Sequence, residues 1–132
     1  CSRISEWLLA NQLMKDENTK ALLGSWKHYE SPVLRRLFWY HQGRLRWTGQ
    51  THPDNTVSLL DALERNLAKE DPEVQWAMNL TAGSIGVHDT SHRTRCIKLG
   101  EKVGLYNDEP VAPNCTSDYL PEFIRIEAAK RA

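Results

Sequence analysis

Two arginines and two aromatic residues lie close together within residues 31–47, on one side of a predicted helix: Arg35, Arg36, Trp39 and Tyr40. A guanidinium group binds a phosphate through two parallel hydrogen bonds, and an aromatic ring packs against a sugar or a base. This combination is typical of a surface that grips a nucleic-acid backbone. The same residue types also stabilise contacts between proteins and between stacked helices.

Basic residues continue beyond this cluster. Between Ser31 and Pro53 the chain has four arginines and two histidines and no acidic residue, whereas residues 54–73 carry six acids and two bases. A second basic segment, residues 92–103, holds Arg93, Arg95, Lys98 and Lys102 against one acid, Glu101. Both segments fit a phosphate-binding surface, and both also fit solvated helix faces whose acidic partners lie elsewhere in the chain.

The first cluster lies in a segment that recurs forty residues later. Residues 31–47 and 71–87 each open with a small polar residue followed by proline, which suits a helix N-cap and the first helical position. Apolar residues then recur at helical spacing in both copies: Leu34, Leu37, Phe38 and Leu45 match Val74, Ala77, Met78 and Ile85. Two equivalent helices with a shared apolar face are therefore predicted.

The remaining periodic segments are also helical, and no segment alternates as a strand does. Seven helices are predicted, over residues 3–15, 19–30, 32–47, 56–69, 72–86 and 92–103, with a last helix capped by Asp118. Asp89, Thr90 and Ser91 offer caps for the sixth helix, and Gly104 ends it. Helix pairs with a period of 40 residues indicate an all-α, HEAT-like superhelix. We expect residues 1–132 to form one such domain, the C-terminal part of a longer solenoid.

Composition limits the class of protein. Seventeen basic residues balance seventeen acidic ones, and no apolar run is long enough to span a membrane. The three cysteines leave one unpaired and show no C-x-x-C spacing, which predicts reduced thiols and a cytoplasmic protein, nucleoid-associated if bacterial. His88 and His92 are spaced four residues apart, but a predicted helix break separates them. We therefore expect neither a metal nor a cofactor.

Three stretches resemble a known family. Residues 75–88 (QWAMNLTAGSIGVH), 93–106 (RTRCIKLGEKVGLY) and 115–117 (CTS) are similar to the C-terminal part of the DNA alkylation repair family, HEAT-repeat DNA glycosylases. The resemblance implies a helical groove that wraps duplex DNA, alkylated or not, and cleavage of the N-glycosidic bond of alkylated purines. It also implies that Arg36 binds a backbone phosphate. Trp76 and Trp39 are candidates for an aromatic wall beside the sugar.

Two positions depart from the family pattern. A groove-lining tryptophan of the family falls on Leu80, and the catalytic aspartate falls at or near Cys1, where no carboxylate is present. The catalytic residue is therefore unassigned, and the candidate DNA-binding residues are Arg36, Arg35, Trp39, Tyr40 and Trp76. Three functions stay open: an alkylpurine glycosylase, a DNA-binding relative without the chemistry, and a scaffold for protein partners.

Overall fold

The computed structural model describes residues 32–111, 113 and 115–131. This part of the chain consists of α-helices and loops, without a β-strand. The helices are α3 (Pro32–Trp47), α4 (Thr56–Asn66), α5 (Pro72–His88), α6 (Arg93–Val103) and α7 (Leu120–Lys130), and a short 3-10 helix, η2 (Leu67–Lys69), follows α4. The all-α prediction is confirmed for this part. The two helices predicted over residues 3–15 and 19–30 lie outside the described residues.

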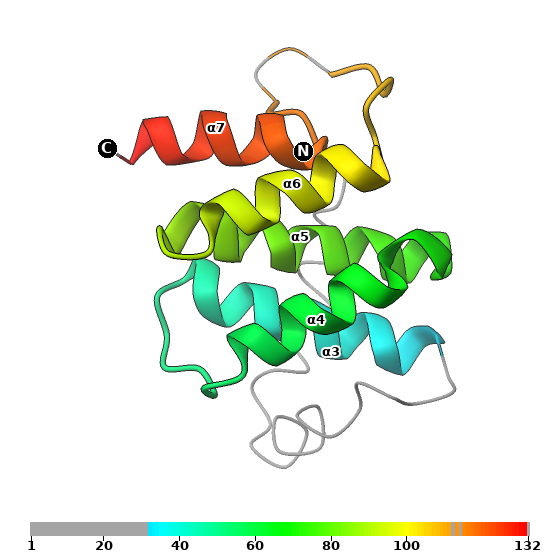
Figure 1. Cartoon of the computed structure of the whole chain (residues 1–132), viewed down its shortest axis with the longest axis vertical. Coiled ribbons are helices and arrows are strands. Elements are labelled where there is room, and N and C mark those ends of the chain that lie inside the picture. The colour runs from blue at the N-terminus through cyan, green and yellow to red at the C-terminus, as the bar shows by residue number, and fades with distance from the viewer. Residues whose placement is uncertain (1–31, 112, 114, 132) are drawn as a thin grey trace.

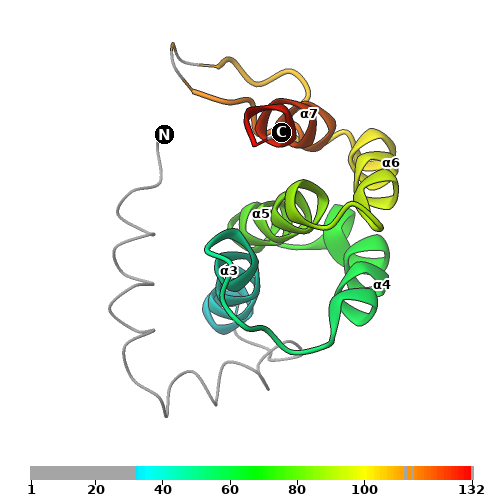
Figure 2. The ribbon, with the colours of Figure 1, turned by 90° about the vertical axis from the view of Figure 1, so that its left-hand side faces the viewer.

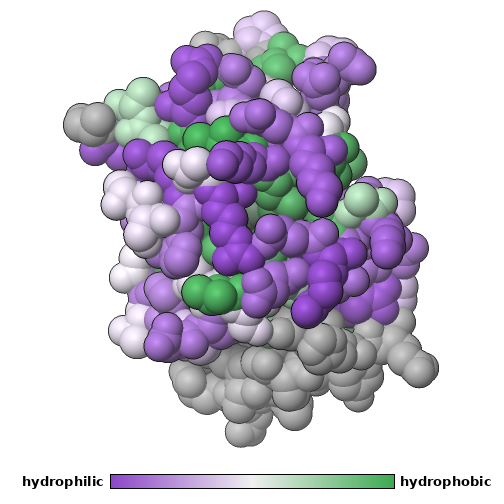
Figure 3. All heavy atoms as spheres, in the orientation of Figure 1, coloured by the Kyte–Doolittle hydropathy of each residue, from purple (hydrophilic) through white to green (hydrophobic). Residues whose placement is uncertain are grey.

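The helices form two rows (Figures 1 and 2). α3, α5 and α7 lie side by side in one row and run in the same direction, while α4 and α6 lie in the second row and run the opposite way. α5 packs against α3, α4, α6 and α7. The face made by α4 and α6 is mostly hydrophilic, with apolar residues only in small separate areas (Figure 3). α5 is therefore the central helix of the described chain.

The sequence of α5 explains its central position. No charged side chain occurs between Glu73 and His88, and every residue from Ala77 to Val87 is buried except Leu80, which is half-buried. The buried polar groups are satisfied by backbone carbonyls: Thr81 Oγ1 donates to Trp39 O at 2.6 Å, and Ser84 Oγ donates to Leu80 O at 2.9 Å. A helix without a charged face can be covered on all sides. Both predicted apolar sets, on α3 and on α5, face the core or its edge.

Glycines allow α7 to pack closely on α5 and α6. A Cβ atom on Gly86 would lie 2.5 Å from Ile124 Cδ1, and one on Gly100 would lie 2.6 Å from both Leu120 Cβ and Pro121 Cδ. These distances are too short for carbon atoms in contact. The approach of α7 therefore depends on the missing side chains at these positions.

Proline and glycine positions set the helix ends as predicted, but the side-chain caps do not form. α3 and α5 begin at Pro32 and Pro72, and Gly104 follows α6 with a φ of +69°. Asp71 makes no side-chain capping bond, and the last helix begins at Leu120 after Tyr119, so Asp118 does not cap it. α6 likewise begins after His92 without a side-chain capping bond.

The loop before α6 explains why its predicted cap is missing. Asp89 Oδ1 accepts a hydrogen bond from Ser91 N–H at 3.0 Å, inside the turn rather than from the helix. Such local bonding competes with capping.

Candidate nucleic-acid interface

Arg35 is a structural residue of the described fold. Its Nε and Nη2 donate to the two carboxylate oxygens of Glu70 at 2.9 and 2.8 Å, and Asp71 lies 3.6 Å away. The Glu70 hydrogen bond raises the pKa of Arg35. Burial opposes ionisation of Glu70, but the bonds from Arg35 and from Asp71 N–H outweigh it and lower the Glu70 pKa. The pair joins α3 to the connection between η2 and α5.

Arg36, the next residue, has a different environment. Its Nη1 lies 3.7 Å from Glu73 Oε2, in the first turn of α5, and the side chains are 19% and 66% exposed respectively. Arg36 makes further interactions besides this one. The 3.7 Å contact is longer than a hydrogen bond, and its acidic partner is largely solvated. The structure thus separates two neighbouring arginines that the sequence predicts to act together.

The aromatic rings predicted to accompany them are buried. Trp39 is 2% exposed and Tyr40 is 3% exposed, and both belong to the hydrophobic core. Trp39 packs edge-on against Phe38 with ring centroids 5.5 Å apart. Every residue from Phe38 to Gly43 is buried, so neither ring lies on an open side of α3, and a contact of Trp39 or Tyr40 with DNA stays a prediction. The physical reason for this burial is that the middle turns of α3 are buried all round, whereas the apolar pattern predicts burial along a single stripe of the helix.

Trp76 is the predicted aromatic residue that remains partly accessible. Its ring stacks on Tyr40, with centroids 5.9 Å apart and planes 26° apart. Trp76, Leu80 and Phe123 line a small cavity of about 30 Å³. Leu80, the position of the family's groove tryptophan, therefore lies beside Trp76 on α5. The structure brings Tyr40 and Trp76 together and leaves Arg35 and Arg36 with different acidic partners.

The second basic segment is used largely for internal contacts. Arg93 donates from Nε to Gly86 O and from Nη2 to Val87 O, both at 2.8 Å, and so caps the C-terminal end of α5. Arg95 binds Asp61 at 2.6 Å and also contacts Glu64, which links α6 to α4. Lys98 and Lys102 are exposed. For Arg95, the alternative of acidic partners elsewhere in the chain is the one observed, whereas Arg93 bonds backbone carbonyls.

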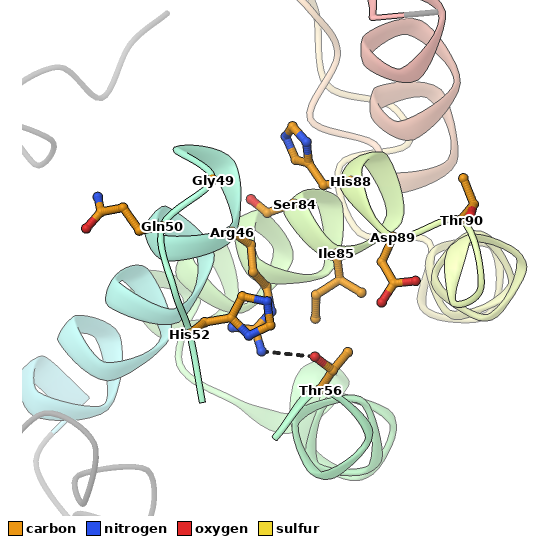
Figure 4. Close-up of a pocket in the computed structure, with 10 residues that line it drawn as sticks. All are labelled: Arg46, Gly49, Gln50, His52, Thr56, Ser84, Ile85, His88, Asp89 and Thr90. Carbon is orange, nitrogen blue, oxygen red and sulfur yellow. Dashed lines mark hydrogen bonds between the residues drawn. The ribbon is translucent and has the colours of Figure 1, made fainter. Parts of the chain in front are cut away.

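A larger pocket lies where α3 and α5 end and α4 begins, and it was not predicted. Its volume is about 340 Å³ (Figure 4). Residues from the three helices and the α3–α4 loop line it, including Arg46, His52, Thr56, Ile85 and Asp89. The excess of arginine and histidine between Ser31 and Pro53 was a sequence signal for this region. Which of those residues converge could not be seen without the fold.

The cysteines differ from the prediction of three reduced thiols. Cys96 is a free thiol buried between α5, α6 and α7, and burial raises its pKa to about 12. Cys115 is disulfide-bonded, so the prediction of reduced thiols is wrong for this residue.

Neither a metal cluster nor a membrane span is found in the described residues. His88 packs edge-on against Trp47, with ring centroids 5.2 Å apart, and His92 lies 3.8 Å from Asp89. No group of three or more His, Cys, Asp or Glu residues in this part of the chain could hold a metal ion. No described helix combines the length and the apolar character needed to cross a bilayer.

Comparisons with known proteins give no relative for this chain. No protein-family model matches it, and no significant match was found among curated proteins or solved structures.

Proposed function

We propose that this chain binds duplex DNA as a HEAT-like protein of DNA alkylation repair and excises alkylated purines. Two features of the fold support this. Consecutive helices from α3 to α7 alternate in direction, and they lie in two rows (Figure 2). Stacked helix pairs of this kind form superhelices with a long concave surface, which suits an extended ligand such as a duplex.

The observation that carries the proposal is the environment of Arg36. The family resemblance makes this residue the phosphate ligand, and its contact with Glu73 is 3.7 Å long, to a carboxylate that is 66% exposed. A DNA phosphate can displace such a partner, because a guanidinium binds a phosphate through two charge-assisted hydrogen bonds. Arg35 cannot exchange partners as readily, because both of its bonds to Glu70 are short and largely shielded from water.

The excision step needs a carboxylate that the resemblance leaves unassigned. Cleaving the N-glycosidic bond builds positive charge on the deoxyribose while a cationic base departs, so a nearby carboxylate would stabilise the transition state. Trp76 could cover the sugar on one side, since its ring is partly accessible at the edge of α5. The same protein without a suitably placed carboxylate would bind DNA and leave the bond intact.

Two assays separate these functions: release of methylated bases from duplex DNA, and binding of duplex DNA. Duplex DNA treated with a methylating agent is incubated with the protein, and released 7-methylguanine and 3-methyladenine are quantified by chromatography. Release above the spontaneous rate supports excision. Duplex binding without release supports a DNA-binding relative, and failure to bind any duplex contradicts the proposal.

A scaffold for protein partners is the competing function. The pairing of Arg35 and Arg95 with acids of the same chain, and the formal net charge of zero, favour it. A protein partner would not impose the steep loss of affinity with salt that phosphate contacts impose. The salt dependence of binding therefore distinguishes the two.

A further inference from the structure

The 340 Å³ pocket contains a buried cation, Arg46, whose nearest acid in the pocket, Asp89, does not reach it as an ion pair. Burial lowers the pKa of Arg46, and the charge of Asp89 opposes that effect only in part. Arg46 is 6% exposed, and no carboxylate of the described residues forms an ion pair with it. Its bonded acceptors are all neutral: Nη1 donates to Gln42 O and Oε1, and Nη2 donates to Asn55 Oδ1 at 2.9 Å and Thr56 Oγ1 at 3.1 Å. These four bonds use all four Nη hydrogens, so an anion would have to take the place of one of the neutral acceptors. A buried charge is costly unless an opposite charge compensates it.

Two further groups beside Arg46 can bond to an anion. Thr56 Oγ1 accepts its bond from Arg46, so its own hydroxyl hydrogen remains available to donate. His52 Nδ1 lies 2.9 Å from Pro53 O, and because a carbonyl only accepts, Nδ1 carries the hydrogen. The other nitrogen, Nε2, can then donate when protonated or accept the hydroxyl of a hydrogen phosphate. Arg46 is bonded to Thr56, and His52 lines the same pocket (Figure 4).

The other residues around the pocket define its limits. His88 and Gln50 point away from the centre (Figure 4), and Gln50 Nε2 is bonded to Thr48 Oγ1 at 2.8 Å. Ile85 supplies an apolar wall. Asp89 lies across from Arg46 and carries a charge that would repel an anion, although its Oδ1 is bonded to Ser91 and His92 lies 3.8 Å away. The affinity of this site for an anion thus depends on the balance between attraction to Arg46 and repulsion by Asp89.

We infer that this pocket binds an oxyanion of the phosphate class through Arg46, Thr56 and His52. The site is separate from Arg36, which lies near the opposite end of α3, so it does not depend on the proposed DNA-binding function. The source of the phosphate can be a free phosphate compound or a phosphate of a nucleic-acid backbone. Both present the same oxygen atoms to the guanidinium.

Inorganic phosphate is the direct probe. The complete chain is titrated with phosphate at constant ionic strength and followed by amide chemical shifts, which we expect to saturate and to concentrate on residues 50–56 and 89–90. His52→Ala should weaken binding about tenfold, the loss of one charge-assisted bond. His88→Ala, the matched histidine on the same rim, should leave the affinity unchanged. Asp89→Asn keeps the oxygen that Ser91 needs and should tighten binding about threefold by removing a repulsive charge.

Other results would overturn the inference. Shifts that stay linear up to about 50 mM phosphate, or that spread over exposed lysines, would show no specific site. Equal affinity of His52→Ala and His88→Ala, or no gain from Asp89→Asn, would contradict the assigned ligands. Titration of duplex DNA then identifies the source, because a backbone phosphate requires His52→Ala to weaken DNA binding as well. Unchanged DNA affinity together with weakened phosphate affinity assigns the pocket to free phosphate compounds.

Discussion

Arg35 and Glu70 are joined by two short hydrogen bonds across 35 positions of sequence, and their side chains are only 19% and 15% exposed. This ion pair fixes the start of α3 to the connection that leads into α5. Its two bonds and its partial burial set it apart from an ordinary surface pair, which contributes little to stability. It is a long-range polar contact between the first copy of the sequence repeat and the residue that directly precedes the second copy.

Removing one partner of this pair should destabilise the fold. Arg35→Gln or Glu70→Gln removes the charge-assisted bonds between these two partly buried groups, and we expect each to lower the free energy of unfolding by about 1–3 kcal/mol. The double variant should cost less than the sum of the single ones, since each loss is shared. Urea denaturation of the wild type, the two single variants and the double variant measures the coupling free energy between the two residues. Additive losses would show that the pair is not a stabilising contact.

The same pair predicts a pH dependence. The pKa of folded Glu70 lies below its ordinary value of 4.5, so the stabilisation from its ionised form is complete above that pH and is lost as the pH falls through the lower folded value. The Glu70→Gln protein should lack this part of the acid destabilisation. Denaturation midpoints measured between pH 7 and pH 3 test this. Parallel curves for the wild type and Glu70→Gln would contradict it.

Close packing at Gly100 gives a prediction about the core. In Gly100→Ala the new Cβ would lie 2.6 Å from Leu120 and Pro121, so α7 must shift, at a cost of about 1–3 kcal/mol. Lys98→Ala is the control, an exposed position on the same helix where alanine should be nearly neutral. Thermal unfolding followed by circular dichroism compares them. Equal midpoints would show that α6 and α7 are less closely packed than described.

The Cys96 thiol should be protected in the folded protein. Burial raises its pKa from 9.0 to about 12, which leaves about a thousandfold fewer thiolates at pH 8. Labelling by an alkylating reagent at this position should therefore be very slow until denaturant is added. Mass spectrometry of digested protein locates the label, and Cys96→Ala identifies the peptide. Rapid labelling of Cys96 in the native protein would contradict its burial.

The sequence predicts the helices well where local chemistry determines them. Pro32, Pro72 and Gly104 mark the ends of helices through backbone constraints that act within a few residues. The side-chain caps were predicted less well, because Asp89 had another local donor in Ser91 and used it. Such competition between neighbouring groups is not visible in residue spacing.

The candidate site could be predicted only in part, since its details depend on long-range packing. Periodicity identifies one apolar face on α3, but it cannot show that the middle of the helix is enclosed, so the burial of Trp39 and Tyr40 was missed. It also cannot show which arginine meets which acid. Glu70 directly precedes the second copy of the repeat and Glu73 lies within it, and the fold brings Glu70 to Arg35 and Glu73 to Arg36. The Arg46 pocket was missed because three helix ends build it.

The most direct test of the proposed function is the salt dependence of duplex DNA binding by the wild type and by Arg36→Gln, measured by fluorescence anisotropy. Arg35→Gln is the matched control, and its binding is measured under conditions in which this variant is fully folded. We expect the affinity of the wild type to fall steeply with salt, and the slope of log affinity against log salt to decrease by about 0.9 in Arg36→Gln, one phosphate contact, and to stay unchanged in Arg35→Gln. Binding that is absent, insensitive to salt, or equally salt-dependent in the wild type and Arg36→Gln would contradict a phosphate contact at Arg36.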